Sequence, residues 1–408
     1  MNCRHCYSEL SLNFIDLGTT PPSNSYLDKC DLSKKEIYYP LKVMVCQKCW
    51  LVQTEDYASA DEIFDENYAY FSSTSLGWLN HAKRYSDMIS RRLNLTNKDL
   101  VVEIASNDGY LLKNFHKKNI PSMGIEPTKS TANVSKKFGF EVICDFFSEN
   151  LSHKVFAQKK ANLIICNNVL AHVPDINDFI SGLLFALDRN GTITIEFPHL
   201  LELIKENQFD TIYHEHFSYL SLLSLNQILS TFNLKIYDVD ELNTHGGSLR
   251  AYISHSDSEF AIDPKVKKII QQEQSFGINK TQTYSDFQER INRIKYEFLS
   301  FLISLKLKGK KIVGYGAAAK GSTLLNFSGV KSDLIDYVVD GSESKQGKFL
   351  PGSRIPIFPP SVLFNDKEVD VILILPWNIQ TEILTQIKSN RSNIPDVYIA
   401  IPEITKIN

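Results

Sequence analysis

The chain has 408 residues, of which 43% are hydrophobic and 22% are charged, and its formal net charge is −3. This composition is typical of a folded protein, and the length allows two or three domains. The small net charge argues against a nucleic-acid partner or a membrane-surface partner. Because the sequence shows no long apolar run and no apolar segment near its start, we expect a cytoplasmic protein.

Four of the seven cysteines form two CxxC pairs, in "CRHC" and "CQKC". Each pair can direct two thiolates at one ion, and two pairs supply the four sulfur ligands of a tetrahedral structural zinc site. Unligated thiols are the alternative, since a disulfide framework is not expected in a cytosolic chain. We predict a zinc-binding domain over residues 1–60, with Cys3, Cys6, Cys46 and Cys49 as ligands. Cys144 and Cys166 lie in apolar text and are predicted to be core residues.

Residues 61–95 are expected to be helical, and residues 99–255 alternate apolar strands with helical segments. That alternation is typical of a parallel sheet covered by helices. A helical stretch over 263–308 leads to a second alternating unit, which starts at "KKIVGYG". The expected fold class is therefore α/β, with two doubly wound domains after the cysteine-rich segment.

A strand, a tight turn and a helix start follow one another in "VVEIASNDGYLL". Glu103 lies near the strand end, and Asn107, Asp108 and Gly109 form the turn. Glu126 ends the next strand about 20 residues further on, where a carboxylate can bind a ribose diol. The loop lacks the GxGxxG sequence that holds a pyrophosphate, which favours S-adenosylmethionine over a dinucleotide. An ordinary strand–turn–helix is the alternative.

Two later strand ends supply further candidates. Asp145 could lie near an adenine, or it could cap the helix that follows it. "NNVLAHVPD" places Asn167 and His172 after a strand, at the carboxyl end where ligands bind in such sheets.

The segment "TIYHEHFSYLS" contains two histidines, one glutamate and two tyrosines in eleven residues. A histidine near its ordinary pKa is a suitable base, and a tyrosine hydroxyl can stabilise an oxyanion. The HxH spacing could chelate a metal, but no third-ligand pattern accompanies it, and a structural strand edge is a further alternative. In a strand, Tyr213 and Glu215 would share one face, and His214 and His216 the other.

Two glycine-containing loops complete the set of motifs. In "HGGSLR", which includes His245, the glycines permit close approach to a ligand and Arg250 could hold a phosphate or carboxylate; a plain hairpin turn is the alternative. "VGYGAAAKGSTLL" has a GxGxxA pattern that predicts NAD if read literally, with Asp340 as the ribose-binding acid. Lys320 and Ser322 at the helix start fit a mononucleotide or nucleotide-sugar diphosphate at least as well, and a packing turn is the remaining alternative.

The order of these motifs is more specific than any one of them. Over essentially its whole length the chain resembles the sugar C-methyltransferases that act on nucleotide-linked keto-deoxysugars. The resemblance implies a small zinc-binding domain and a central Rossmann-like class I methyltransferase domain with a helical N-terminal arm, over 61–262. It further implies a helical connector over 263–310 and a Rossmann-like nucleotide-sugar-binding domain over 311–408.

The resemblance also implies roles for individual residues. His216 would be the base, with Tyr213, Glu215 and His172 around the reacting sugar, and either Tyr68 or Tyr70 would be an active-site tyrosine. Ala105 stands where the family is expected to have glycine in the cofactor loop. The predicted cofactor contacts are Glu103, Ala105, Asn107, Asp108, Gly109, Glu126, Asp145 and Asn167, and the predicted substrate contacts are His214, His245, Arg250, Gly316, Lys320 and Ser322.

The resulting expectation is an S-adenosylmethionine-dependent methyltransferase that acts on a carbon beside a ketone in a TDP-, GDP- or CDP-linked sugar, as a monomer or homodimer. Its alternatives are an O- or N-methyltransferase on another small molecule, an NAD-dependent sugar-nucleotide oxidoreductase, and a zinc-ribbon binding module with a degenerate catalytic domain.

Overall fold

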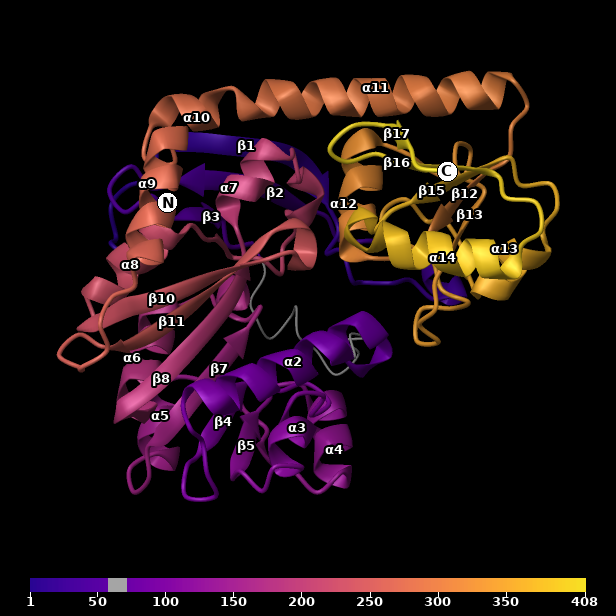
Figure 1. Ribbon diagram of the computed structural model, residues 1–408. Helices are drawn as coiled ribbons and strands as arrows, with labels where there is room; N and C mark the ends of the chain where they lie inside the picture. The colour runs from indigo at the N-terminus through magenta and orange to yellow at the C-terminus, as the bar shows by residue number, and fades with distance from the viewer. Residues whose placement is uncertain (58–71) are drawn as a thin grey trace.

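The computed structural model describes residues 1–57 and 72–408, so Tyr68 and Tyr70 lie outside the described residues. Three β-sheets organise the described part of the chain (Figure 1). No helix in these described ranges combines the length and the apolar character needed to cross a membrane.

The first sheet has four antiparallel strands in the order β1-β2-β3-β9. Its strands are β1 (Leu12–Thr20), β2 (Tyr39–Val45), β3 (Val52–Thr54) and β9 (Ser218–Tyr219), and a 3-10 helix, η1 (Lys29–Ser33), lies between β1 and β2. The fourth strand comes from the middle of the chain, directly after the His-rich segment. The zinc-binding part is therefore not built from residues 1–60 alone, because it needs β9 to complete its sheet.

The second sheet has seven strands in the order β10-β11-β8-β7-β4-β5-β6, and all neighbours are parallel except at β11. Its central strands are rich in Val and Ile and buried on both faces, as helices cover both sides. The strands are β4 (Val101–Ile104), β5 (Ser122–Ile125), β6 (Glu141–Ile143), β7 (Ala161–Asn167), β8 (Leu187–Pro198), β10 (Leu234–Leu242) and β11 (Ser248–His255).

Helices α2, α5, α6 and α8 of this region begin at a capping side chain. Ser75 accepts a hydrogen bond from the Trp78 amide at the start of α2, and Ser148 does so for Leu151 in α5. The helical elements are η2 (Ser72–Thr74), α2 (Leu76–Arg92), α3 (Leu112–His116), α4 (Lys129–Lys137), α5 (Glu149–Val155), η3 (Leu170–His172), α6 (Ile176–Ala186), α7 (Leu200–Lys205), η4 (Phe209–Thr211), α8 (Leu222–Ser230) and η5 (Thr244–Gly246).

A connector of three helices leads to the third sheet: α9 (Pro264–Phe276), α10 (Thr281–Ser285) and α11 (Phe287–Leu307). Figure 1 shows α11 running from the first sheet to the C-terminal domain. The third sheet has the order β14-β13-β12-β15-β16-β17 and is parallel except for β17. Its elements are β12 (Ile312–Tyr315), α12 (Ala319–Ser328), β13 (Tyr337–Val339), β14 (Ile357–Phe358), α13 (Pro360–Asn365), β15 (Val371–Ile374), η6 (Trp377–Ile379), α14 (Gln380–Asn390), β16 (Asp396–Ile399) and β17 (Thr405–Lys406).

One hydrophobic core joins the first sheet, the connector and the third sheet. Phe14 of β1 stacks on Phe287 of α11 with ring centroids 4.5 Å apart, and both belong to the same buried cluster as Ile312 of β12. At the other end of the first sheet, Cys3 and Cys46 belong to the core of the second sheet. The cysteine-rich part therefore packs on both of the larger domains, which fixes their relative placement.

One alternative considered for the His-rich segment and one prediction for a cysteine are wrong. The segment from Tyr213 to Phe217 is a turn and not a strand, because the His216 amide donates back to the Tyr213 carbonyl at 2.9 Å. Cys144 is exposed at the end of β6, whereas Cys166 is fully buried as expected. The apolar text around Cys144 belongs to a short edge strand, which leaves its last residues outside the core.

Candidate active site and zinc centre

The four N-terminal cysteines converge on one point. Their sulfur atoms all lie within 4.8 Å of one another, and the closest pairs are Cys3–Cys49 at 3.5 Å and Cys6–Cys46 at 3.4 Å. Zinc–sulfur bonds of about 2.3 Å give a tetrahedron with edges of about 3.8 Å, so the thiolates fit a zinc ion. The Gln53 side-chain amide donates to Cys3 Sγ at 3.4 Å, which would orient that ligand. The centre is closed by four protein ligands and is structural.

The cofactor loop lies where the order of the second sheet reverses. β4 pairs with β5 on one side and with β7 on the other, and ligands bind at such a switch point beyond the carboxyl ends of the strands. Glu126 accepts hydrogen bonds from the backbone N–H groups of Asn107 at 2.8 Å and Thr128 at 3.0 Å. The carboxylate is thereby fixed beside the loop.

The backbone of this loop is left-handed at two residues other than glycine. Ala105 has φ +53° and Asn107 has φ +50°. Asparagine tolerates this region, but alanine does so at a cost of about 1 kcal/mol. The conformation expected of the family's glycine is thus retained in spite of the alanine. Gly109 is also left-handed, with φ +79°, and a Cβ there would lie 2.7 Å from the Phe140 ring.

Several buried acceptors at this edge have no hydrogen-bond partner among the described residues. They are Glu103 Oε2, Asp108 Oδ1 and Asn167 Oδ1. Burial, followed by the charges of Glu126 and Asp108, raises the pKa of Glu103 well above its ordinary value. Unpaired buried acceptors are costly, so a ligand with hydroxyl donors and positive charge fits this site. S-adenosylmethionine carries a ribose diol, an ammonium group and a sulfonium ion.

Asp145 lies at the same edge of the sheet, after β6. Its side chain is exposed and accepts a hydrogen bond from the Phe146 amide at 2.8 Å. The alternative that it caps a helix is wrong, because Ser148 is the N-cap of α5. Contact with an adenine remains a prediction.

Three aromatic side chains form a compact cluster beside this edge. The His216 ring centroid lies 4.1 Å from that of Tyr213 and 4.7 Å from that of His172. The three residues come from the turn before β9 and from η3. We call them the ring cluster. Because the segment is a turn, Tyr213 and His216 lie side by side, where a strand would have placed them on opposite faces.

The protonation of both histidines follows from their partners. Nδ1 of His216 bonds the Thr211 carbonyl at 3.0 Å, and Nδ1 of His172 bonds the Glu215 carbonyl at 2.7 Å. A carbonyl can only accept, so each Nδ1 carries the hydrogen and each Nε2 carries a lone pair. Burial lowers the pKa of His172 to about 4 and that of His216 well below its ordinary value. Both rings are therefore neutral at pH 7.

His214 of the same segment faces away from the ring cluster. His214 Nε2 bonds the Pro40 carbonyl at 3.1 Å, and its ring contacts that of Tyr39. Its described contacts are thus with the first sheet, so its predicted role in substrate binding has no support in this geometry. Glu215 is 2% exposed, and one of its carboxylate oxygens accepts from the Asn24 amide at 3.1 Å.

The switch point of the third sheet faces the second domain. β12 pairs with β13 and β15, and the residues after β12 and β15 include Lys320 and Trp377. Trp377 Nε1 donates to Asp210 at 2.7 Å, and Lys320 Nζ lies 5.1 Å from the Trp377 ring. The Lys320 charge contributes, after burial, to the lowered pKa of His216 and of His245. The cation therefore lies near both histidines.

The glycines and hydroxyls near this interface have structural partners. A Cβ at Gly316 would lie 2.4 Å from Pro376, and one at Gly246 would lie 2.3 Å from Trp377. The Ser322 hydroxyl donates to the Ser23 carbonyl at 3.1 Å. Asp340 accepts from the Ala317 amide at 2.7 Å, so it holds the loop itself. Packing explains these residues, and Lys320 is the predicted phosphate contact whose position still supports that role.

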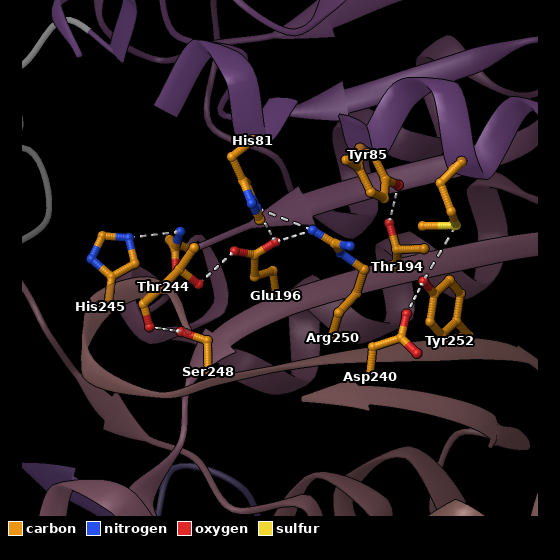
Figure 2. A network of polar contacts seen from close by, with 12 residues as sticks. His81, Tyr85, Thr194, Glu196, Asp240, Thr244, His245, Ser248, Arg250 and Tyr252 are labelled. Carbon is orange, nitrogen blue, oxygen red and sulfur yellow. Dashed lines mark hydrogen bonds and ion pairs between the residues drawn. The ribbon is translucent and has the colours of Figure 1, made fainter. Parts of the chain in front are cut away.

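Arg250 belongs to a buried polar network and does not project toward a phosphate (Figure 2). Its guanidinium pairs with Glu196, which also accepts from His81 at 3.0 Å and from Thr244 at 3.1 Å. Burial opposes ionisation, but His81 and Arg250 lower the pKa of Glu196 to about 2. This ion pair gives no support to the predicted role of Arg250 in binding an anionic ligand, which stays a prediction.

The network ends at His245, which lies where several parts meet. The Asn168 side chain is 3.4 Å from His245 Nε2, and the Trp78 ring is 5.5 Å from the His245 ring. Sequence analysis missed Glu196, Trp78 and Trp377. A signal existed for Glu196 and Trp377, since each comes at or just after the end of an apolar strand, "TITIEF" or "VILILP".

The second sheet is largely parallel, its strand order reverses at β4, and a loop lined by carboxylates lies at that switch point. This arrangement is that of a Rossmann-like S-adenosylmethionine-dependent methyltransferase. Family models agree along the chain: a zinc binding domain matches residues 3–64, a methyltransferase domain 78–239, and a C-methyltransferase C-terminal domain 243–402. C-methyltransferase NovU from Streptomyces niveus is 34% identical over 402 residues, covering 98% of this chain and 95% of that protein. The chain belongs to the S-adenosylmethionine-dependent C-methyltransferases that carry an N-terminal zinc-binding domain.

Solved structures match the methyltransferase region at low similarity. Magnesium protoporphyrin IX methyltransferase from Synechocystis, with bound SAH, has 15% identity and a TM-score of 0.35, over 44% of this chain and 84% of that chain. The CcbJ methyltransferase from Streptomyces caelestis has 7% identity and a TM-score of 0.36, over 43% of this chain and 90% of that chain.

Removing zinc is expected to abolish methyl transfer. β3 directly follows the second cysteine pair and pairs with β9, which adjoins the ring cluster, so unfolding the zinc centre disorders both. We expect Cys46→Ser to lose bound zinc and activity together, as measured by metal analysis and transfer of labelled methyl. Cys30→Ser is the control, because Cys30 is exposed and outside the cluster. Normal activity in zinc-free protein would contradict this.

Replacing Glu196 by Gln is expected to lower the free energy of unfolding by about 3 kcal/mol, because Arg250 is left buried without a counter-charge. The denaturation midpoint measures this. Asp257→Asn is the control, since the Arg189–Asp257 pair has side chains 81% and 64% exposed and should contribute under about 1 kcal/mol. The Glu196 pKa falls from 4.5 to about 2 on folding, so its stabilisation is complete above pH 4.5 and is lost toward pH 2. Equal effects of the two substitutions on stability would contradict the conclusion that Glu196 compensates the buried charge of Arg250.

Proposed function

We propose that this protein transfers a methyl group from S-adenosylmethionine to the carbon beside the ketone of a nucleotide-linked keto-deoxysugar, and that His216 is the base. The observation that carries this proposal is the position of the ring cluster. It lies beside the cofactor edge of the second sheet and near Lys320 at the switch point of the third sheet. The similarity to a C-methyltransferase over nearly the whole chain supports transfer to carbon.

The protein's share of the chemistry is proton removal and charge stabilisation. A ketone acidifies the neighbouring C–H bond, and the lone pair on Nε2 of neutral His216 can accept that proton. The Thr211 carbonyl holds the ring and would stabilise its cation. Neutral His172 presents an acceptor at Nε2, so it suits a sugar hydroxyl better than an enolate oxygen. The Tyr213 hydroxyl is the donor of the ring cluster that can serve the enolate.

The cofactor and the nucleotide would be held on opposite sides of this cluster. Bound S-adenosylmethionine supplies an electrophilic methyl group, and Glu126 with the loop after β4 would hold its ribose. Lys320 would face the diphosphate of the substrate. Buried acceptors without a described partner, Asn168 Oδ1 and Asp210 Oδ1, are available near the interface for ligand donors. The domains would position the two reactants, which supplies much of the rate enhancement.

His216→Asn is expected to reduce turnover by at least 100-fold, because general base catalysis contributes that much. Binding of S-adenosylmethionine, measured by calorimetry, should be unchanged. His214→Asn is the matched control from the same turn, since its ring contacts the first sheet, and it should retain most of its activity. Near-normal turnover in the His216 variant would refute its assignment as the base.

Proton removal can be detected without methyl transfer. With S-adenosylhomocysteine in place of the methyl donor, in D₂O, we expect the accepted keto-sugar nucleotide to gain deuterium at the acidic carbon, as seen by mass spectrometry. His216→Asn should abolish this exchange. An O- or N-methyltransferase needs no carbon acid, so methyl transfer by the wild type without exchange would favour that alternative.

A further inference from the structure

The loop over residues 21–28 leaves the first sheet and crosses onto the C-terminal domain. Leu27 pairs with Phe349 through backbone hydrogen bonds of 3.0 and 2.8 Å. The Tyr26 hydroxyl donates to the Ala317 carbonyl at 2.6 Å. Ala317 lies in the glycine loop directly after β12, at the edge where ligands bind in such sheets. The zinc-binding domain therefore supplies a segment of the candidate substrate site.

Asn24 connects this loop to the His-rich turn. Its Nδ2 donates to Glu215 Oε1 at 3.1 Å, and its Oδ1 lies 3.4 Å from the Tyr26 hydroxyl. The second oxygen of the carboxylate, Glu215 Oε2, is buried and has no hydrogen-bond partner among the described residues. One oxygen is held by the loop, and the other is left for a donor that the described protein does not provide.

We propose that Asn24 is a positioning residue for the reaction: it orients the Glu215 carboxylate so that Oε2 accepts a hydrogen bond from a hydroxyl of the sugar substrate. The inference rests on the proposed function and adds Glu215 to its site, because Glu215 directly precedes His216 and its carbonyl accepts from His172 Nδ1 at 2.7 Å. It assigns the zinc-binding domain a part in positioning a substrate-binding group, in addition to its structural role. The loop is fixed to both larger domains, so a carboxylate held by it keeps its place between them.

The surroundings of Glu215 explain why the hydrogen bond from Asn24 affects the pKa of the carboxylate. The Glu215 carboxylate acts on the hydroxyls of Tyr26 and Tyr219, whose pKa values burial raises, so both are neutral at pH 7. Lys345 and Asp340, which also act on Tyr26, lie 3.8 Å apart as an ion pair. Burial raises the pKa of Glu215, and hydrogen bonds from its own backbone amide and from Asn24 oppose this. Loss of the Asn24 donor should raise it further.

The test compares Asn24→Ala and the isosteric Asn24→Asp with Ser25→Ala, an exposed neighbour in the same loop. Methyl transfer to an accepted keto-sugar nucleotide is measured from pH 5 to 9. We expect kcat/KM at pH 7 to fall roughly 10- to 100-fold in both Asn24 variants, as for loss of a hydrogen bond to a charged group. The acidic limb of the profile should move to higher pH, because the ionised carboxylate is needed and is harder to form.

Thermal midpoint and affinity for S-adenosylmethionine should stay near the wild-type values, which separates positioning from folding. The Glu215→Gln variant separates a role of Glu215 in the reaction from the positioning role of Asn24. If that variant is fully active, Glu215 has no part in the reaction and the inference fails, while the assignment of His216 as the base, which the exchange experiment tests, still stands. If it is impaired while both Asn24 variants keep the wild-type pH profile, only the positioning inference fails. Asn24→Asp preserves the side-chain volume, so its pH profile decides between the outcomes if Asn24→Ala does not fold. A loss of kcat/KM in Ser25→Ala equal to that in the Asn24 variants would overturn the inference.

Discussion

The backbone of the turn before β9 is the point on which the candidate site depends, because all three domains bond it. From the first sheet, the Thr54 hydroxyl donates to the His216 carbonyl at 3.1 Å. From the second domain, the Ala171 carbonyl accepts from the Phe217 amide at 2.7 Å. From the C-terminal domain, the Thr323 hydroxyl donates to the Ile212 carbonyl at 2.9 Å. A displacement of any domain would move the ring cluster.

This constraint gives the zinc centre a meaning beyond local stability. A segment of fewer than 60 residues with short strands buries too little surface to be stable alone, and a metal supplies the missing stability. Here the stabilised sheet is also the surface on which β9 forms. The cost of ordering a turn with several buried polar groups is thereby shared among the zinc ion and three hydrogen-bonded neighbours.

Local patterns in the sequence predict the parts of this protein whose chemistry is local. Two CxxC pairs predict the zinc ligands, and a strand followed by a turn and a distant carboxylate predicts the cofactor edge, because few residues at fixed spacing suffice. The alternation of residues did not reveal that the His-rich segment is a turn. His214, Glu215 and His216 are three polar residues in a row, a pattern that fits a turn or an edge strand equally, and the hydrogen bond that closes the turn depends on the packing of other domains.

The sequence also could not show which polar residues form ion pairs or hydrogen bonds within the protein instead of with a ligand. Arg250 and Ser322 have the chemistry to bind phosphate, but Glu196 and the Ser23 carbonyl occupy them. Glu196 stands directly opposite Arg250 in the sheet, a pairing that depends on strand order and register. Asn24 gives no signal at all, since it is one polar residue in a turn-like stretch, "PPSNSYLD", and its importance arises only where that loop meets Glu215.

The charges around the ring cluster suggest how binding and proton removal are connected in the proposed reaction. Lys320 lowers the pKa of His216, after the larger effect of burial, and so weakens it as a base. A diphosphate held at Lys320 would offset that positive charge, and Coulomb's law then requires the pKa of His216 to rise. Without the nucleotide the histidine stays neutral and weakly basic. With the nucleotide bound, His216 would become a stronger base while the sugar ketone lies beside it. The diphosphate, which does not react, would thus help to activate the histidine that removes the proton from the sugar.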